Sequence, residues 1–112
     1  MEAYILIHIR HVPTQDCEAL EYALAMAAFD LPVRLLFSGN GVHWLSRRHA
    51  ALREGGKSPS KLLSACSMYG IDQIALVDNG VGREDAISED AAVLDPVEAS
   101  NWVAAAHHVV SF

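Results

Sequence analysis

The aliphatic and β-branched residues of this 112-residue chain gather in five short runs, most of them separated by segments of helical length. The first run, Tyr4 to Ile9, is almost continuously apolar, as in a strand that is covered on both faces. Further strands are expected at residues 33–38, 73–77, 91–94 and 109–112. Strands that alternate with helices are joined by right-handed crossovers and pair mainly in parallel. The sequence therefore predicts a single-domain α/β fold: a mainly parallel five-stranded sheet with helices on both faces, layered as in flavodoxin.

Capping residues and glycines indicate where the helices begin and end. The first helix is expected to be capped by Thr14 or Asp16 and to run to about Phe29. The other helices are expected at residues 42–53, 59–69 and from 96 onward. The last start is the clearest, because Asp95 can accept backbone N–H bonds and Glu98 occupies the capping-box position.

Helical spacing predicts which side chains face the sheet. The inward residues of the two later helices are expected to be Leu62, Leu63, Cys66 and Tyr69, and Ala99, Trp102, Val103 and Ala106. The first helix has two apolar sides, formed by Cys17, Leu20 and Leu24 and by Ala19, Tyr22, Ala23 and Met26. We predict that Ala19, Tyr22 and Met26 form a subunit contact. The alternative is a monomer with a few exposed apolar side chains.

Composition narrows the class of protein. The chain has 14 acidic and 8 basic residues, a net charge of −6, and 52% hydrophobic residues, which suits one compact domain. Its longest apolar stretch is interrupted by Asp30, Pro32 and Arg34, so no membrane span is expected. The first residues lack the features of a signal peptide, and two distant cysteines do not form a disulfide framework. A cytoplasmic location is predicted.

Positive charge is concentrated in one segment. Arg47, Arg48, Arg53 and Lys57, followed by Lys61, are opposed there only by Glu54. Such a segment could bind an acidic carrier protein or tRNA. It could equally be the solvated face of a helix.

In parallel sheets, binding and catalytic groups lie beyond the carboxyl ends of the strands. There, Ser38, Gly39, Asn40 and Gly41 could present backbone N–H groups to a small anion, or form an ordinary glycine turn. Asp78 and Asn79 follow the third expected strand and are interpreted as an Asx-type turn. The histidine pairs lack matching partners, so no metal site and no cofactor are predicted.

The two cysteines are candidate nucleophiles. Cys17 is expected in the first turn of a helix, where the dipole would favour a thiolate. Its spacing with Leu20 and Leu24 is typical of a small buried hydrophobe instead. Cys66 lies on the apolar side of its helix and is interpreted as structural.

Three segments resemble the DsrE/DsrF-like family, with most similarity to its TusC/DsrF branch. They are the strand and turn Val33 to Val42, the helix Lys61 to Tyr69 leading through Gly70 into the third strand, and the ending His108 to Phe112. The resemblance implies a sulfur-relay role in tRNA 2-thiouridine synthesis or sulfur oxidation. It also implies assembly with related subunits, as a homo-oligomer or a mixed hexamer.

The family's relay cysteine lies at the end of the third strand, where this chain has Val77, Asp78 and Asn79. The resemblance therefore implies a non-transferring subunit whose loops at 38–41 and 78–79 border the cysteine of a partner. Two alternatives stay open: a sulfurtransferase that uses Cys17, and a homo-oligomeric module that binds a small anion at Ser38 to Gly41.

Overall fold

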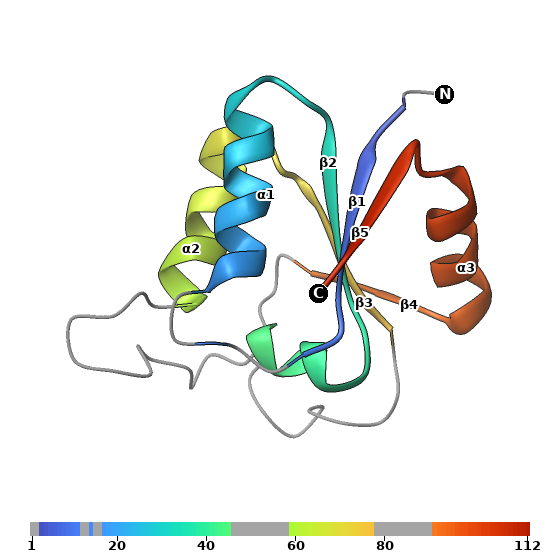
Figure 1. The fold of residues 1–112 in the computed structure, drawn as a ribbon. Coiled ribbons are helices and arrows are strands. Elements are labelled where there is room, and N and C mark those ends of the chain that lie inside the picture. Colours follow the sequence, from blue (N-terminus) through green and yellow to red (C-terminus); the bar gives the residue numbers. More distant parts are fainter. Residues whose placement is uncertain (1–2, 12–13, 15–16, 46–58, 78–90) are drawn as a thin grey trace.

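The computed structural model describes residues 3–11, 14, 17–45, 59–77 and 91–112 (Figure 1). The strands are β1 (Ile5–Ile9), β2 (Val33–Phe37), β3 (Gln73–Val77), β4 (Ala92–Leu94) and β5 (His108–Ser111). The α-helices are α1 (Glu18–Ala28), α2 (Pro59–Cys66) and α3 (Pro96–Ala105). Two 3₁₀ helices, η1 (Gly39–Leu45) and η2 (Ser67–Tyr69), complete the described elements.

The five strands form one parallel sheet in the order β4-β3-β2-β1-β5. From β1 to β4 the chain advances across the sheet in one direction, and α3 then carries it back to β5 beside β1. Because right-handed crossovers in opposite directions lie on opposite faces, α1 and α2 cover one face and α3 covers the other (Figure 1). The predicted fold class is confirmed.

The core has two layers of unequal size. Among the described residues, sixteen buried side chains form the layer between the sheet and α1 and α2, with Ile7, Leu35 and Phe37 at its centre. Only six form the layer under α3, including Leu6 and Leu36. This division follows from the alternation of side chains along β1 and β2, which are apolar at both faces.

Helix α1 differs from its predicted form in two ways. Its N-cap residue is Cys17, in a left-handed conformation with φ 52°, and Thr14 donates a hydrogen bond to the Glu18 carboxylate, with no side-chain cap at the helix start. Cys17 therefore precedes the first turn. Ala19, one of the three residues predicted to form a subunit contact, is buried in the core with Leu20 and Ala23. Small alanine side chains let the helix approach the sheet closely, which widens the buried side.

Three other expectations need correction. The predicted helix at 42–53 begins as the 3₁₀ helix η1, and the part beyond Leu45 lies outside the described residues. Tyr69 is exposed, because η2 tightens the chain after α2 and Gly70 ends it at φ 85°. Val103 is exposed as well, since α3 stands off the sheet along part of its length.

The predicted start of α3 is confirmed. The Glu98 amide donates to the Asp95 carboxylate at 2.8 Å, and the Asp95 amide donates to the Glu98 carboxylate at 3.4 Å. Among the described helices, none has the length and hydropathy that crossing a membrane requires.

Candidate functional site at the carboxyl edge of the sheet

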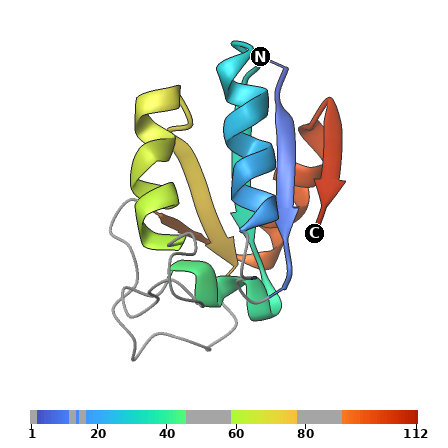
Figure 2. The same ribbon diagram turned by 60° about the vertical axis from the view of Figure 1, so that its left-hand side comes forward.

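The carboxyl ends of β1 and β2 lie side by side, and η1 lies beyond them (Figure 2). The Ser38 amide donates to the Ile9 carbonyl at 3.0 Å, which extends the ladder by one step. The chain then turns, and the Gly41 amide donates to the Ser38 carbonyl at 2.9 Å. These bonds fix the loop after β2 against the end of β1.

Gly41 permits this close approach. A Cβ atom at this position would lie 2.0 Å from the Ile9 carbonyl oxygen, far inside any van der Waals contact. Gly39 has a different role, because its φ of 54° is a left-handed conformation in open space. The glycine turn predicted from the sequence is thus held by one steric and one conformational requirement.

His8 and Ser38 form a polar pair where these strands end. The His8 Nε2 and Ser38 Oγ atoms are 2.7 Å apart, and both side chains are partly buried. Burial of the imidazole lowers the pKa of His8, and the nearby Arg10 charge lowers it further. The imidazole is therefore neutral near pH 7 and can accept or pass on a proton.

The pair lies on the wall of a groove of about 390 Å³ between the sheet and α3. The rest of the wall is mainly apolar, with Leu36, Val77 and Pro96 among its residues. An apolar groove with one polar pair suits an extended segment or a small ligand that carries a single polar group.

Trp44 supports the same edge from the other face of the sheet. It is buried, and its indole Nε1–H donates to the His11 carbonyl at 2.7 Å. A second hollow of about 250 Å³ lies next to it, between Phe112 and the start of α1. The hydrogen bond from the Trp44 indole to the His11 carbonyl links the β1–α1 connection to η1.

Neither cysteine presents its thiol at this edge. Cys17 and Cys66 are both 0% exposed. The Cys17 thiol donates to the Thr14 carbonyl at 3.5 Å, and the Cys66 thiol donates to the Leu62 carbonyl at 3.4 Å. Burial raises the pKa of Cys66 to about 11, so its thiol is protonated at physiological pH.

The predicted small-anion site has fewer backbone N–H groups available to a ligand than its sequence indicates. The amides of Ser38 and Gly41 are already donated to carbonyl groups of the chain, although Gly39 and Asn40 are exposed. Asp78, Asn79 and the basic residues Arg47, Arg48, Arg53 and Lys57 lie outside the described residues. In the described part of the chain, no three His, Cys, Asp or Glu side chains gather as metal ligands would.

Two of the three residues predicted to form a subunit contact on α1, Tyr22 and Met26, are not fully buried. Tyr22 is partly exposed and packs against Phe112 with 5.7 Å between ring centroids, and Met26 is half-buried against the core.

The His8–Ser38 pair was not predicted from the sequence. The signal was present, because both residues lie near the carboxyl ends of apolar strands that were expected to be parallel. Seeing it required knowing that β1 and β2 are neighbours, with His8 in register with Leu36. Trp44 lacked such a signal, since its placement depends on the path of η1.

Comparison with known proteins places the chain in a family. No curated protein matches it in sequence. The crystal structure of the ychN protein from E. coli has the same fold, with a TM-score of 0.80 and 17% sequence identity over 99% of this chain and 100% of that one. The model of the DsrE/DsrF-like family matches residues 3–112. This chain therefore belongs to the DsrE/DsrF-like family.

Proposed function

We propose that this chain is a non-transferring subunit of a sulfur-relay complex, of the TusC/DsrF type, that assembles with a related subunit carrying the relay cysteine. The observation that carries the proposal is the complete burial of both thiols, Cys17 and Cys66. Membership of the DsrE/DsrF-like family supplies the sulfur-relay context.

Sulfur transfer requires a thiolate that can reach the outer sulfur of a persulfide. Cys66 does not meet this requirement, because its pKa is about 11 and its side chain is enclosed. Cys17 is enclosed at the start of α1. The sequence holds no third cysteine, and Val77, the last residue of β3, is followed by Asp and Asn.

The chain's own contribution lies at the carboxyl edge. The loop Ser38 to Gly41, and the segment with Asp78 and Asn79, would border the cysteine of the partner. The neutral His8 imidazole beside Ser38 could take the proton that the partner's thiol releases as it becomes a nucleophile. The segment with Arg47, Arg48, Arg53 and Lys57 would meet an acidic carrier protein or tRNA, depending on the pathway that the complex serves.

Persulfide loading of the purified chain tests the non-transferring role. The folded protein is treated with inorganic polysulfide, and its intact mass is measured before and after. We expect no added sulfur on the native wild type and added sulfur once it is denatured. Ser100→Cys is the control, because Ser100 is exposed on α3 and a thiol there should gain sulfur in the folded state. A native wild type that takes up sulfur and passes it to an acceptor thiol contradicts the proposal.

Assembly is tested separately by co-expression with a family member that has a cysteine after its third strand. Native mass spectrometry should detect a stable complex containing both chains. Recovery of the two chains only as separate species would remove the proposed role.

A further inference from the structure

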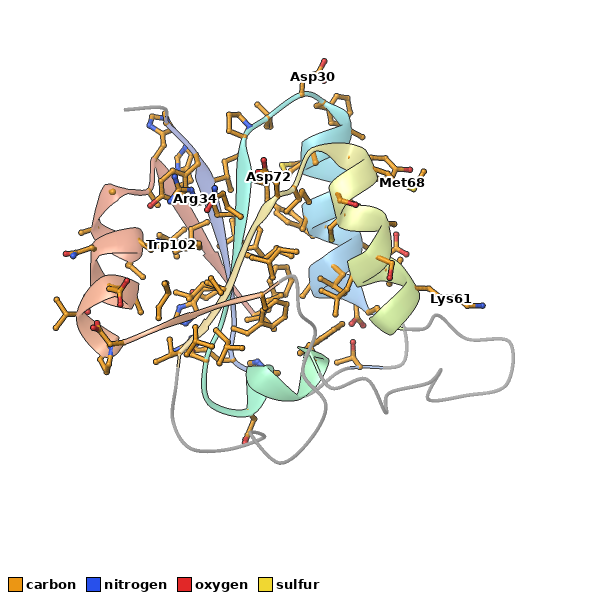
Figure 3. All side chains as sticks on the ribbon, turned by 180° about the vertical axis from the view of Figure 1, so that it is seen from behind. Asp30, Arg34, Lys61, Met68, Asp72 and Trp102 are labelled. Carbon is orange, nitrogen blue, oxygen red and sulfur yellow. The ribbon has the colours of Figure 1, made fainter. Side chains whose placement is uncertain are left out.

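Helix α3 is fastened to the sheet along one side and borders the groove of about 390 Å³ along another. Trp102 belongs to the fastened side, where the Tyr4 hydroxyl donates to its carbonyl at 2.6 Å and the Arg34 guanidinium carbon lies 4.9 Å from the centre of its ring. Figure 3 shows Arg34 and Trp102 on the face of the sheet that α3 covers. The helical wall of the groove is formed by Pro96, Ala99, Ser100, Val103 and Ala104.

A hydroxyl group and an imidazole meet in this groove. Both Ser38 and His8 belong to its wall, and the 2.7 Å between Ser38 Oγ and His8 Nε2 is the distance at which a general base contacts the nucleophile that it activates. The Ser38 amide donates to the Ile9 carbonyl, and the Ser38 carbonyl accepts from the Gly41 amide. The backbone therefore holds the hydroxyl in a fixed position beside the imidazole.

His8 has the protonation state that a base requires. Burial and the charge of Arg10 lower its pKa, so the imidazole is neutral near pH 7. In the tautomer that carries its proton on Nδ1, the Nε2 atom accepts the hydrogen of the Ser38 hydroxyl. Among the described residues no carboxylate bonds to this imidazole, so the two residues form a dyad in place of a triad.

The wall of the groove favours acyl transfer over phosphoryl transfer. Beside the dyad it is mainly apolar, with Leu36, Val77 and Val103, and its described residues include no lysine or arginine that would neutralise a phosphate. A short hydrocarbon chain suits such a groove. Arg10 lies outside the described wall, but its charge reaches His8 and would also favour the negative oxygen that forms during acyl transfer.

We propose that Ser38 and His8 form a nucleophile–base dyad that transfers the acyl group of carboxylic esters with a short apolar acyl chain, first to Ser38 and then to water. In the first step Ser38 Oγ bonds to the carbonyl carbon while its proton moves to His8 Nε2. The bond to the leaving alcohol then breaks, and the alcohol takes that proton. In the second step water gives a proton to His8 Nε2 and attacks the acyl group, which leaves as a carboxylic acid while Ser38 Oγ recovers the proton.

Reaction with p-nitrophenyl butyrate tests the proposal. We expect a burst of p-nitrophenolate of about one equivalent per folded chain and slow turnover afterwards, because no third group orients the imidazole. Intact mass should show one butyryl group, and peptide mapping should place it on Ser38. The chain denatured in urea should give no burst.

Three variants assign the roles of the groove residues. Ser38→Ala should abolish the burst, and His8→Gln should slow it about 100-fold. Ser111→Ala is the matched control and should react like the wild type, since Ser111 is in register with His8 on β5 but forms no hydrogen bond with it in the described structure. Val103→Asp should slow the reaction of the butyrate ester about tenfold and leave that of the acetate ester nearly unchanged.

Several results would overturn the proposal. They are a folded wild type without a burst, a butyryl group on a residue other than Ser38, an undiminished burst in Ser38→Ala, and cleavage of p-nitrophenyl phosphate in place of the esters. The position of the adduct on the wild type decides the question even if Ser38→Ala or His8→Gln fails to fold. The proposal does not rest on the sulfur-relay role, because persulfide loading reports on thiols and this assay on a hydroxyl group, so each can fail while the other succeeds.

Discussion

At the carboxyl edge of the sheet, Gly41 leaves no room for a larger side chain. An alanine there would place its Cβ 2.0 Å from the Ile9 carbonyl oxygen, which belongs to a central strand and cannot move without disturbing the ladder. We expect Gly41→Ala to lower the free energy of unfolding by about 1–3 kcal/mol. Urea denaturation measures the change. Gly39→Asn is the control, because asparagine tolerates the left-handed conformation and the site is open, and it should cost far less. Equal losses of unfolding free energy in the two variants would show that backbone strain, and not the close approach of Gly41 to Ile9, governs this turn.

The second prediction at this scale concerns the protonation of His8. Because burial and then Arg10 lower its pKa, the histidine should titrate below its ordinary value of 6.5 in an NMR titration. Arg10→Gln should move the midpoint part of the way back, since burial is the larger cause. As the pH falls through 6.5 the unfolded chain takes up this proton before the folded chain does, so this group contributes less stability in acid. A midpoint above 6.5 would contradict the buried neutral pair with Ser38.

At the scale of single elements, α3 is the helix that depends most on its cap. It buries little of its surface, so the reciprocal bonds between Asp95 and Glu98 carry a larger share of its stability. Asp95→Ala should lower the free energy of unfolding by about 1 kcal/mol. Asp95→Asn retains an acceptor for the Glu98 amide and should cost less. A loss in Asp95→Asn that equals the loss in Asp95→Ala would mean that the carboxylate charge matters more than the bond.

The elements also show what a sequence can and cannot predict. The start of α3 was predicted correctly because its signal is local: four consecutive residues contain both halves of the capping box. The start of α1 was not, since Thr14 bonds to Glu18 and leaves Cys17 at the helix boundary. The outward face of α1 failed at Ala19 for a different reason, because how deep an alanine lies depends on how closely the helix approaches the sheet.

At the scale of the whole molecule, alternating strands and helices were enough to predict the parallel sheet but not its strand order. The candidate site depends on that order, because His8 meets Ser38 only if β1 and β2 are adjacent. The stacking of the Arg34 guanidinium on the rings of Tyr4 and Trp102 depends on it too, since these two aromatic residues are 98 residues apart in the chain. Contacts between distant segments are set by topology, which spacing along the sequence does not encode.

The unequal layers of the core predict that the molecule does not open as a single unit. The layer under α3 is small, and Ala99 is the buried member that the helix contributes, whereas β1 and β2 are covered on both faces. In native-state hydrogen exchange, the amides of α3 should therefore exchange through local opening, with less protection than those of β1 and β2. Tyr4→Phe removes the hydroxyl bond to the Trp102 carbonyl and should speed exchange in α3 about fivefold.

Leu35→Ala distinguishes local opening from global unfolding. Leu35 is buried in the layer beneath α1 and α2, and it stays buried when α3 detaches from the other face. This substitution should lower the protection of β1 and β2, at a cost of about 2–5 kcal/mol in global stability, while α3 exchanges at its previous rate. The same factor of acceleration in α3 and in β1 would show that the helix opens only when the whole sheet unfolds. Local opening of α3 would also widen the groove beside His8 and Ser38, so the same measurement reports how readily a partner could enter the candidate site.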